Sequence, residues 1–121
     1  MEPSSNASAV RDKSYAFAVR TVRLYQYLQG DKKEFVLSKQ VIRSGTAIGA
    51  LVREAEQGES RADFVHKLAI ALKEANETDY WLELLHETRY LSTEAFESMR
   101  NDLAELLKLL TSIIKTTRAG M

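Results

Sequence analysis

The chain has 121 residues, of which 45% are apolar and 28% are charged, and its formal net charge is zero. These values are ordinary for one globular domain with a sizeable core, and they differ from those of a disordered or membrane chain. The apolar runs are too short to span a bilayer, and no secretory signal is visible. The chain has no cysteine, which excludes disulfides and thiolate chemistry. We therefore expect a cytoplasmic protein with a single domain.

The chain opens with a polar stretch and then takes on helical spacing. Residues 1–9 hold the only proline and predict a disordered tail, whereas residues 10–121 predict one bundle domain. Residues 10–29 predict the first helix, because their apolar positions share one face and Gly30 offers a C-terminal stop. That face consists of Phe17, Ala18, Thr21, Val22, Leu24, Tyr25 and Leu28.

Three further helices follow, each with apolar positions that step by three and four residues. Residues 34–57 predict the second helix, 61–88 the third and 93–117 the fourth. Ser60 is a suitable N-cap for the third helix, and either Ser92 or Thr93 is a suitable N-cap for the fourth. The predicted core positions are Leu37, Val41, Ser44, Ile48, Leu51 and Ala55, then Phe64, Leu68, Ala71, Ala75, Thr78, Leu82 and Leu85, then Phe96, Met99, Leu103, Leu106, Leu110 and Ile113.

The short links between these helices determine the predicted topology. Links of a few residues make consecutive helices antiparallel, so the fold class is all-α, an antiparallel up-down-up-down four-helix bundle. Charge is divided along the chain, because residues 1–50 hold 8 basic and 4 acidic side chains and residues 51–121 hold 9 and 13. Halves of +4 and −4 favour pairing within the chain or between subunits over general nucleic-acid binding.

Two segments carry a family resemblance. They are QVIRSGTAIGALVREAEQG at residues 40–58 and SRADFVHKLAIALKEANETDYWLELL at residues 60–85. Through them the chain resembles a bacterial family of four-helix bundle proteins, encoded in intervening sequences of large-subunit ribosomal RNA genes and also described as S23 ribosomal protein-like. The resemblance covers about residues 14–117.

The resemblance implies an assembly more than an activity. It implies a ring-shaped homopentamer of four-helix bundles, with the chain itself as the expected partner. It also implies a relation to the accessory proteins of diversity-generating retroelements, which are basic barrels that bring nucleic acid to a reverse transcriptase. This chain departs from those proteins in its zero net charge.

A polar trio stands out on the second and third helices. If the turn between them lies near Gly58, antiparallel pairing brings together residues whose numbers sum to about 117, so Arg43 faces Glu74 and Gln40 faces Glu77. The trio Arg43, Glu74 and Glu77 is therefore expected to form a structural polar network, either buried or at an interface. A ligand site is the alternative.

The third helix is apolar around more of its circumference than one core face needs. Its additional apolar residues predict an oligomer interface, because tryptophan and tyrosine are frequent interface anchors. A wide core face with scattered surface aromatics is the alternative. The predicted interface residues are Ile70, Tyr80, Trp81 and Leu84.

Small and basic residues mark the first two helices. The run of Ser44, Gly45, Ala47, Gly49 and Ala50 predicts close helix packing, because RSGTAIG matches neither the dinucleotide fingerprint nor the P-loop. Basic side chains are frequent in the first hairpin, and they include Arg11, Lys13, Arg20, Arg23, Lys32, Lys33 and Lys39. Phosphate contact through Arg11, Arg20 and Arg23 is the nucleic-acid alternative to solvated surface.

Metal and catalytic chemistry find little support. Glu83-x-x-His86 and Asp63-x-x-His66 resemble half-sites of di-iron bundles, but both lie on the third helix, about 30 Å apart. They cannot share one metal, and we expect His86 to be a hydrogen-bonded packing residue. We assign no catalytic, metal or cofactor residue. The sequence thus favours a non-enzymatic homo-oligomeric scaffold, with a nucleic-acid-binding adaptor as the alternative and an enzyme or metal protein last.

Overall fold

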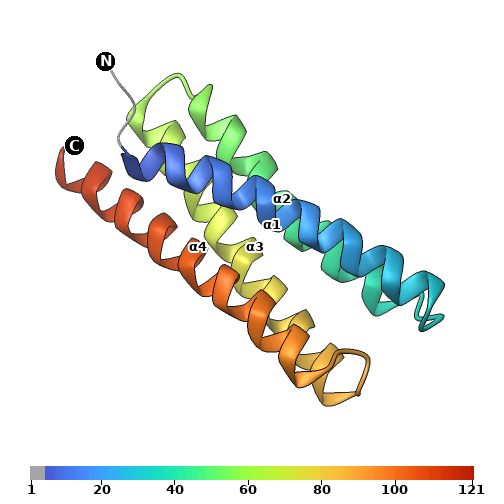
Figure 1. The fold of residues 1–121 in the computed structure, drawn as a ribbon. Coiled ribbons are helices and arrows are strands. Elements are labelled where there is room, and N and C mark those ends of the chain that lie inside the picture. Colours follow the sequence, from blue (N-terminus) through green and yellow to red (C-terminus); the bar gives the residue numbers. More distant parts are fainter. Residues whose placement is uncertain (1–4) are drawn as a thin grey trace.

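Four long α-helices make up the described part of the chain (Figure 1). A computed structural model describes residues 5–121 of the chain, and this described part contains no strand. The prediction of an all-α protein is confirmed. The helices are α1 (Ser5–Gly30), α2 (Leu37–Glu56), α3 (Arg61–Glu87) and α4 (Thr93–Ala119).

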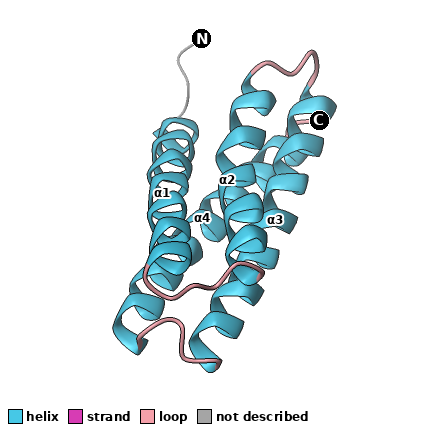
Figure 2. Ribbon diagram, turned by 90° about the vertical axis from the view of Figure 1, so that its right-hand side faces the viewer, coloured by secondary structure: helices cyan, strands magenta, loops and turns pink. Residues whose placement is uncertain are grey.

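The helices run up, down, up and down. The α2–α3 turn and the C-terminus lie at one end of the bundle, and the α1–α2 and α3–α4 turns lie at the other (Figures 1 and 2). Each helix packs on its sequence neighbours, and α1 also packs on α4, whereas the backbones of the two diagonal helix pairs do not approach as closely in the described part of the chain. The predicted antiparallel four-helix bundle is confirmed.

The first helix begins earlier than its sequence pattern predicts. α1 starts at Ser5 rather than at residue 10, so residues 5–9, predicted as part of a disordered tail, are helical. Residues 1–4 lie outside the described residues. The segment 5–9 contains no glycine or proline and has two alanines, the best helix formers. Val10, only 3% exposed, fixes the adjoining turn to the core.

The second helix begins later than predicted, because Glu34 caps it from the preceding loop. Its carboxylate accepts hydrogen bonds from the backbone N–H groups of Val36 at 3.1 Å, Leu37 at 3.0 Å and Ser38 at 2.7 Å. The N–H of Glu34 donates to the Leu28 carbonyl oxygen at 2.9 Å. These bonds satisfy the free donors at the helix start and hold the α1–α2 loop in one shape.

The predicted serine caps begin the last two helices. The Ser60 hydroxyl oxygen accepts from the Asp63 N–H at 3.0 Å, and the Ser92 hydroxyl oxygen accepts from the Ala95 N–H at 3.1 Å. Each cap supplies one of the acceptors that the first turn of a helix lacks. Short polar links with such caps position α3 and α4 without a long loop.

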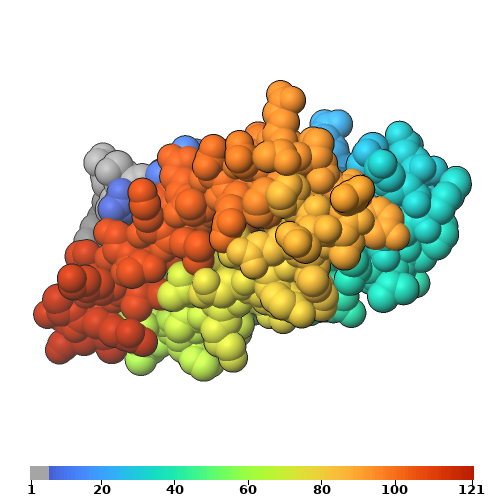
Figure 3. All heavy atoms as spheres, turned by 90° about the horizontal axis from the view of Figure 1, so that it is seen from below, coloured from blue at the N-terminus to red at the C-terminus, as the bar shows by residue number. Residues whose placement is uncertain are grey.

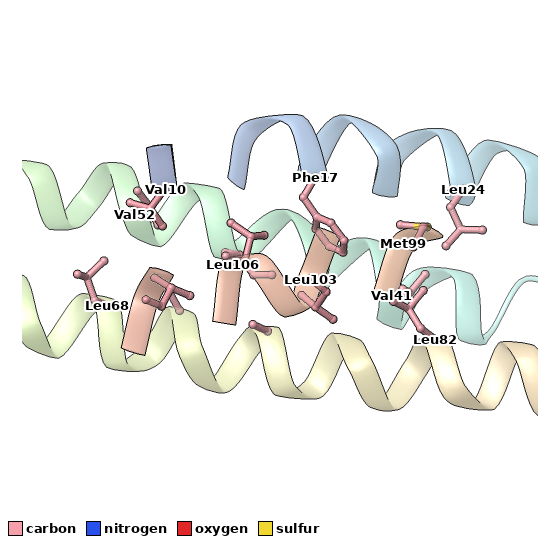
Figure 4. Packing of buried hydrophobic residues seen from close by; sticks show 14 of the residues in the cluster. Val10, Phe17, Leu24, Val41, Val52, Leu68, Leu82, Met99, Leu103 and Leu106 are labelled. Carbon is pink, nitrogen blue, oxygen red and sulfur yellow. The ribbon is translucent and has the colours of Figure 1, made fainter. Parts of the chain in front are cut away.

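All four helices contribute to one apolar core. Figure 4 shows side chains such as Phe17, Val41, Leu82 and Leu103 directed into a shared interior. Most predicted core positions are buried, but Val22 is 39% exposed and its prediction was wrong. It directly follows the buried Thr21, and one residue turns a helix by about 100°. Buried apolar residues that lay outside the predicted core positions are Val10, Val52, Val65, Leu91 and Ile114.

The small residues of α2 allow α1 to approach closely. A Cβ atom at Gly45 would lie 2.6 Å from Thr21 Cγ2, and one at Gly49 would lie 3.2 Å from the Ser14 carbonyl oxygen. Neither distance leaves room for a side chain without movement. The predicted close packing at this run is confirmed, and it explains glycine inside a helix that glycine otherwise weakens.

Candidate interaction surfaces

One flank of α3 carries both residue groups that the sequence singled out. Consecutive positions along this flank are separated by four, three, four and three residues, which places them on one helix face. The flank is turned about 110° away from the core positions of the same helix. We call this face the α3 seam; it consists of Ile70, Glu74, Glu77, Trp81 and Leu84, all half-buried.

Arg43 of α2 bridges the two carboxylates of the α3 seam. Its guanidinium lies 3.4 Å from Glu74 Oε2 and also forms an ion pair with Glu77. Glu77 therefore pairs with Arg43 rather than with Gln40, one turn away from the predicted partner. The Arg43 side chain is 52% exposed, so this network is a surface network and not a buried one. Exposed ion pairs of this kind contribute about 0–1 kcal/mol to stability.

Trp81 is the large anchor of the seam. Its indole N–H donates to Glu77 Oε2 at 3.1 Å, and its ring packs against the core while one side faces out. Tyr80 lies beside it, with ring centroids 5.0 Å apart in an edge-to-face arrangement, and is 54% exposed. The same polar network thus fixes the orientation of a partly exposed tryptophan.

A hollow of about 370 Å³ lies between α3 and α4, next to the seam. Tyr80, Leu84 and Phe96 supply its apolar lining, and Glu83 and Glu87 stand at its edge. We call it the acidic hollow. Its α4 residues, Phe96 and Arg100, lie beyond the α3–α4 turn, so the helical pattern of α3 by itself gave no signal for the hollow.

Arg100 and His86 shape this hollow. Arg100 pairs with Asp79 at 3.1 Å and with Glu83 at 2.8 Å, and its guanidinium lies 5.4 Å from the centre of the Phe96 ring. His86 stacks on Phe96 with centroids 4.4 Å apart, and its Nε2 lies 3.0 Å from Thr93 Oγ1. His86 is the hydrogen-bonded packing residue that the sequence predicted, and it joins the end of α3 to the start of α4.

The α1–α2 loop presents an apolar protrusion. Phe35 is 50% exposed and Val36 is 71% exposed, although both are large apolar residues. Lys32 and Lys33 precede them, and the Lys33 backbone has a positive φ of 55°. We call residues 32–36 the basic knuckle. It was missed at the sequence level because residue 34 was assigned to a helix, which hid the loop.

The carboxylate that supports this loop has an altered acidity. Burial by itself raises the pKa of Glu34, but the backbone N–H groups of Leu37, Ser38 and Val36 bond to the charged form and outweigh it. The net result is a pKa below the ordinary value of 4.5. Glu34 is thus charged at neutral pH and neutralised by backbone dipoles, which leaves the knuckle with the positive character of its lysines.

Two of the three arginines assigned to nucleic acid are paired within the bundle. Arg11 lies 3.5 Å from Glu56, and Arg20 lies 2.6 Å from Asp102 on α4. Within residues 5–121, Arg23 has no ion-pair or hydrogen-bond partner, and it lines a hollow of about 420 Å³ between α1 and α4. The structure therefore does not join the three into one free basic patch.

The residues do not gather into a metal centre. In the described part of the chain, no group of three or more histidine, aspartate and glutamate side chains could hold a metal ion. No described helix is both long enough and apolar enough to cross a membrane. What the surface offers is contact area with aromatic anchors and fixed charges.

Comparison with known proteins places the fold. The family described as 23S rRNA-intervening sequence protein matches residues 6–112. A crystal structure of a protein of unknown function, from the S23 ribosomal protein family of Bacteroides thetaiotaomicron, is similar with a TM-score of 0.90 and 62% sequence identity. The similarity covers 91% of this chain and 98% of that chain. No curated protein matches.

Proposed function

Because this chain belongs to the 23S rRNA-intervening sequence protein family, we propose that it is a non-enzymatic, homo-oligomeric interaction scaffold of the cytoplasm. The α3 seam is the observation that carries this proposal. It places a half-buried tryptophan and two aliphatic side chains in line, with Tyr80 exposed at their side. Aromatic residues of this kind dominate the binding energy of protein interfaces.

The polar residues of the seam support the same role. Arg43 pairs with both Glu74 and Glu77, so the trio carries a net charge of −1 and a partner that covers it needs to supply only one positive group. The Glu77 bond to the Trp81 indole fixes the anchor before binding, and a fixed side chain loses less entropy on association. The ring-shaped pentamer is the assembly that the family resemblance implies.

Light scattering coupled to size exclusion tests the scaffold. We expect a mass several times that of one chain for the wild type. Tyr80→Ser should shift the assembly towards the single chain, because Tyr80 is 54% exposed and lies outside the core. Tyr15→Ser is the matched control, since Tyr15 is 58% exposed on α1. A wild type that stays a single chain at all concentrations would refute the proposal.

A nucleic-acid-binding adaptor, with nucleic acid or a nucleic-acid enzyme as partner, is the second candidate. The observation in its favour is the surface at the end of α1, where the free Arg23 lies near Tyr27 in one hollow. Lys32, 5.9 Å from the centre of the Tyr27 ring, lines the adjoining hollow with Arg89 and Tyr90. Cations interleaved with aromatic rings are typical of single-strand binding.

Fluorescence anisotropy with a short single-stranded RNA separates the two candidates. An adaptor should bind at about 50 mM salt and release at about 200 mM salt, as expected for phosphate contacts. Arg23→Glu should weaken that binding, and Arg118→Glu, at the far end of the bundle, should not. RNA binding that changes neither with salt nor with Arg23→Glu would exclude this surface as the nucleic-acid site.

A further inference from the structure

We propose that the assembly is built head to tail: the basic knuckle of one copy inserts Phe35 and Val36 into the acidic hollow of the next copy. This inference rests on the proposed homo-oligomeric function and names the two surfaces that would meet. Each surface is incomplete in the single chain, and the two are opposite in shape and in charge.

The knuckle is a preformed protrusion. Phe35 and Val36 are exposed side by side, outside the core, where a monomer gains nothing from large apolar side chains. Glu34 holds the loop through its three backbone hydrogen bonds, the shortest of them 2.7 Å long. A loop that is already ordered loses little entropy when it docks. Lys32, Lys33 and Lys39 are all exposed and lie within four residues of Phe35 or Val36 along the chain.

The hollow is the complementary cavity. Its floor is apolar, with the buried Phe96 ring, Leu84 and the exposed Tyr80, and its volume is about 370 Å³. The charge around the hollow is negative, because Arg100 pairs with both Asp79 and Glu83, and Glu87 adds a third carboxylate. In the described chain Glu87 has no partner of its own. A lysine from outside would supply one.

A second copy is the occupant that this charge pattern selects. Both surfaces belong to one chain, one of them basic and the other acidic, and they reproduce locally the split of +4 and −4 between the two halves of the sequence. Opposite charges around an apolar contact guide the encounter and determine its register. Leu84 belongs to both the hollow and the α3 seam, so the contact continues the interface already proposed.

The knuckle does not fill the hollow of its own chain. The tips of the α1–α2 and α3–α4 hairpins lie at the same end of the bundle (Figure 1), where Lys32 lines a neighbouring hollow together with His86 and Glu87, but Phe35 and Val36 do not line the acidic hollow. Figure 3 shows the α1–α2 tip at one side of the surface formed by α3 and α4. Two different surfaces that bind each other make a heterologous contact, which closes into a ring when the rotation between copies allows it.

Light scattering of one apolar variant provides the first test. Phe35→Asp should reduce the wild-type oligomer to the mass of one chain, with unchanged helix content in circular dichroism because Phe35 lies outside the core. Val22→Asp, at an apolar position on α1 that is 39% exposed, is the control and should leave the oligomer intact. Loss of the oligomer in the control as well would count against the knuckle as the specific contact.

Charge reversal provides the second test. Lys33→Glu and Glu87→Lys should each raise the concentration needed for half-assembly by about tenfold or more. The chain that carries both changes should assemble again, because residue 33 of one copy and residue 87 of the next then again carry opposite charges. A double variant weaker than both single variants would overturn the pairing.

The outcomes separate this inference from the function beneath it. A wild type that is a single chain overturns the scaffold itself. An intact wild-type oligomer that Phe35→Asp leaves unchanged overturns only the knuckle-in-hollow contact and leaves the α3 seam as the interface.

Discussion

Single residues control how closely the first two helices pack and where the second one begins. Gly45 leaves space that Thr21 fills, and the Thr21 hydroxyl donates to the Phe17 carbonyl oxygen at 2.8 Å. Glu34 lies in the loop before α2, and its carboxylate accepts hydrogen bonds from three backbone N–H groups at the start of that helix. The helical spacing of apolar residues does not explain why residue 45 is a glycine. It also gives no reason for the Glu34 carboxylate in the α1–α2 loop.

Gly45→Ala should destabilise the bundle by about 1–3 kcal/mol, because the new Cβ would overlap Thr21. The better helix propensity of alanine, up to about 1 kcal/mol, offsets only part of this cost. Urea unfolding followed by circular dichroism measures the effect. Gly30→Ala is the control, since a Cβ there meets no atom within 4 Å. Equal effects of the two substitutions would contradict the close approach of α1 and α2.

Glu34→Gln should lower the free energy of unfolding by about 1–2 kcal/mol near neutral pH, because a neutral amide accepts these N–H bonds less strongly. The pKa of Glu34 is lower in the folded protein than its ordinary value of 4.5. Such a carboxylate stabilises the fold above its unfolded pKa and loses that contribution as the pH falls through the folded pKa.

The difference between wild type and Glu34→Gln should therefore be constant at neutral pH and shrink as the pH falls below about 4.5. Urea unfolding of both proteins across this range measures the difference directly. Other carboxylates titrate in the same range, and subtracting the variant removes their contribution. A difference that grows in acid would show that the folded pKa is raised rather than lowered.

At the scale of elements, α3 serves two purposes. One face contributes Leu68, Leu82 and Leu85 to the core, and the face about 110° away carries the α3 seam. The register between α2 and α3 follows from their short turn, which is why sequence numbers alone brought Arg43 beside Glu74. They did not bring it beside Glu77, since a long arginine side chain reaches a full turn along the neighbouring helix.

The seam ion pairs should add little to the stability of the single chain. A double-mutant cycle of Arg43→Met with Glu74→Gln should give a coupling energy of about 0.2–1 kcal/mol in dilute, unassembled protein, since Arg43 is 52% exposed. Glu77→Gln should also change the Trp81 fluorescence, because the indole N–H donates to this carboxylate. A coupling of several kcal/mol would mean that the network is buried.

At the scale of the whole molecule, each helix packs on two neighbours around one apolar core. The family resemblance is confirmed by the match over residues 6–112. The relation to retroelement accessory proteins and the pentamer stay predictions. The pairing of Arg11 and Arg20 with α2 and α4 turns basic side chains into links between helices, which favours the scaffold over the adaptor.

Leu103→Ala should cost about 2–5 kcal/mol of stability, because Leu103 has no exposed surface at the centre of the core. Leu107, on the same helix but only partly buried, is the matched control, and Leu107→Ala should cost markedly less. Thermal and urea unfolding of both variants give the comparison. If both substitutions cost the same, the core would be less tightly packed around α4 than the structure indicates.

Helical periodicity by itself determined the four elements, their antiparallel order and most of the core, because the spacing of apolar residues is a local property of each helix. The serine caps and the close approach at Gly45 followed from the residue types at those positions, and the family followed from the resemblance of residues 40–58 and 60–85 to known members. Only the tertiary structure decided which charges meet, that α4 closes the acidic hollow beside Tyr80, and that Glu34 supports an exposed loop. Those features depend on the rotation of one helix against another and on the reach of long side chains, which no spacing within a single helix encodes.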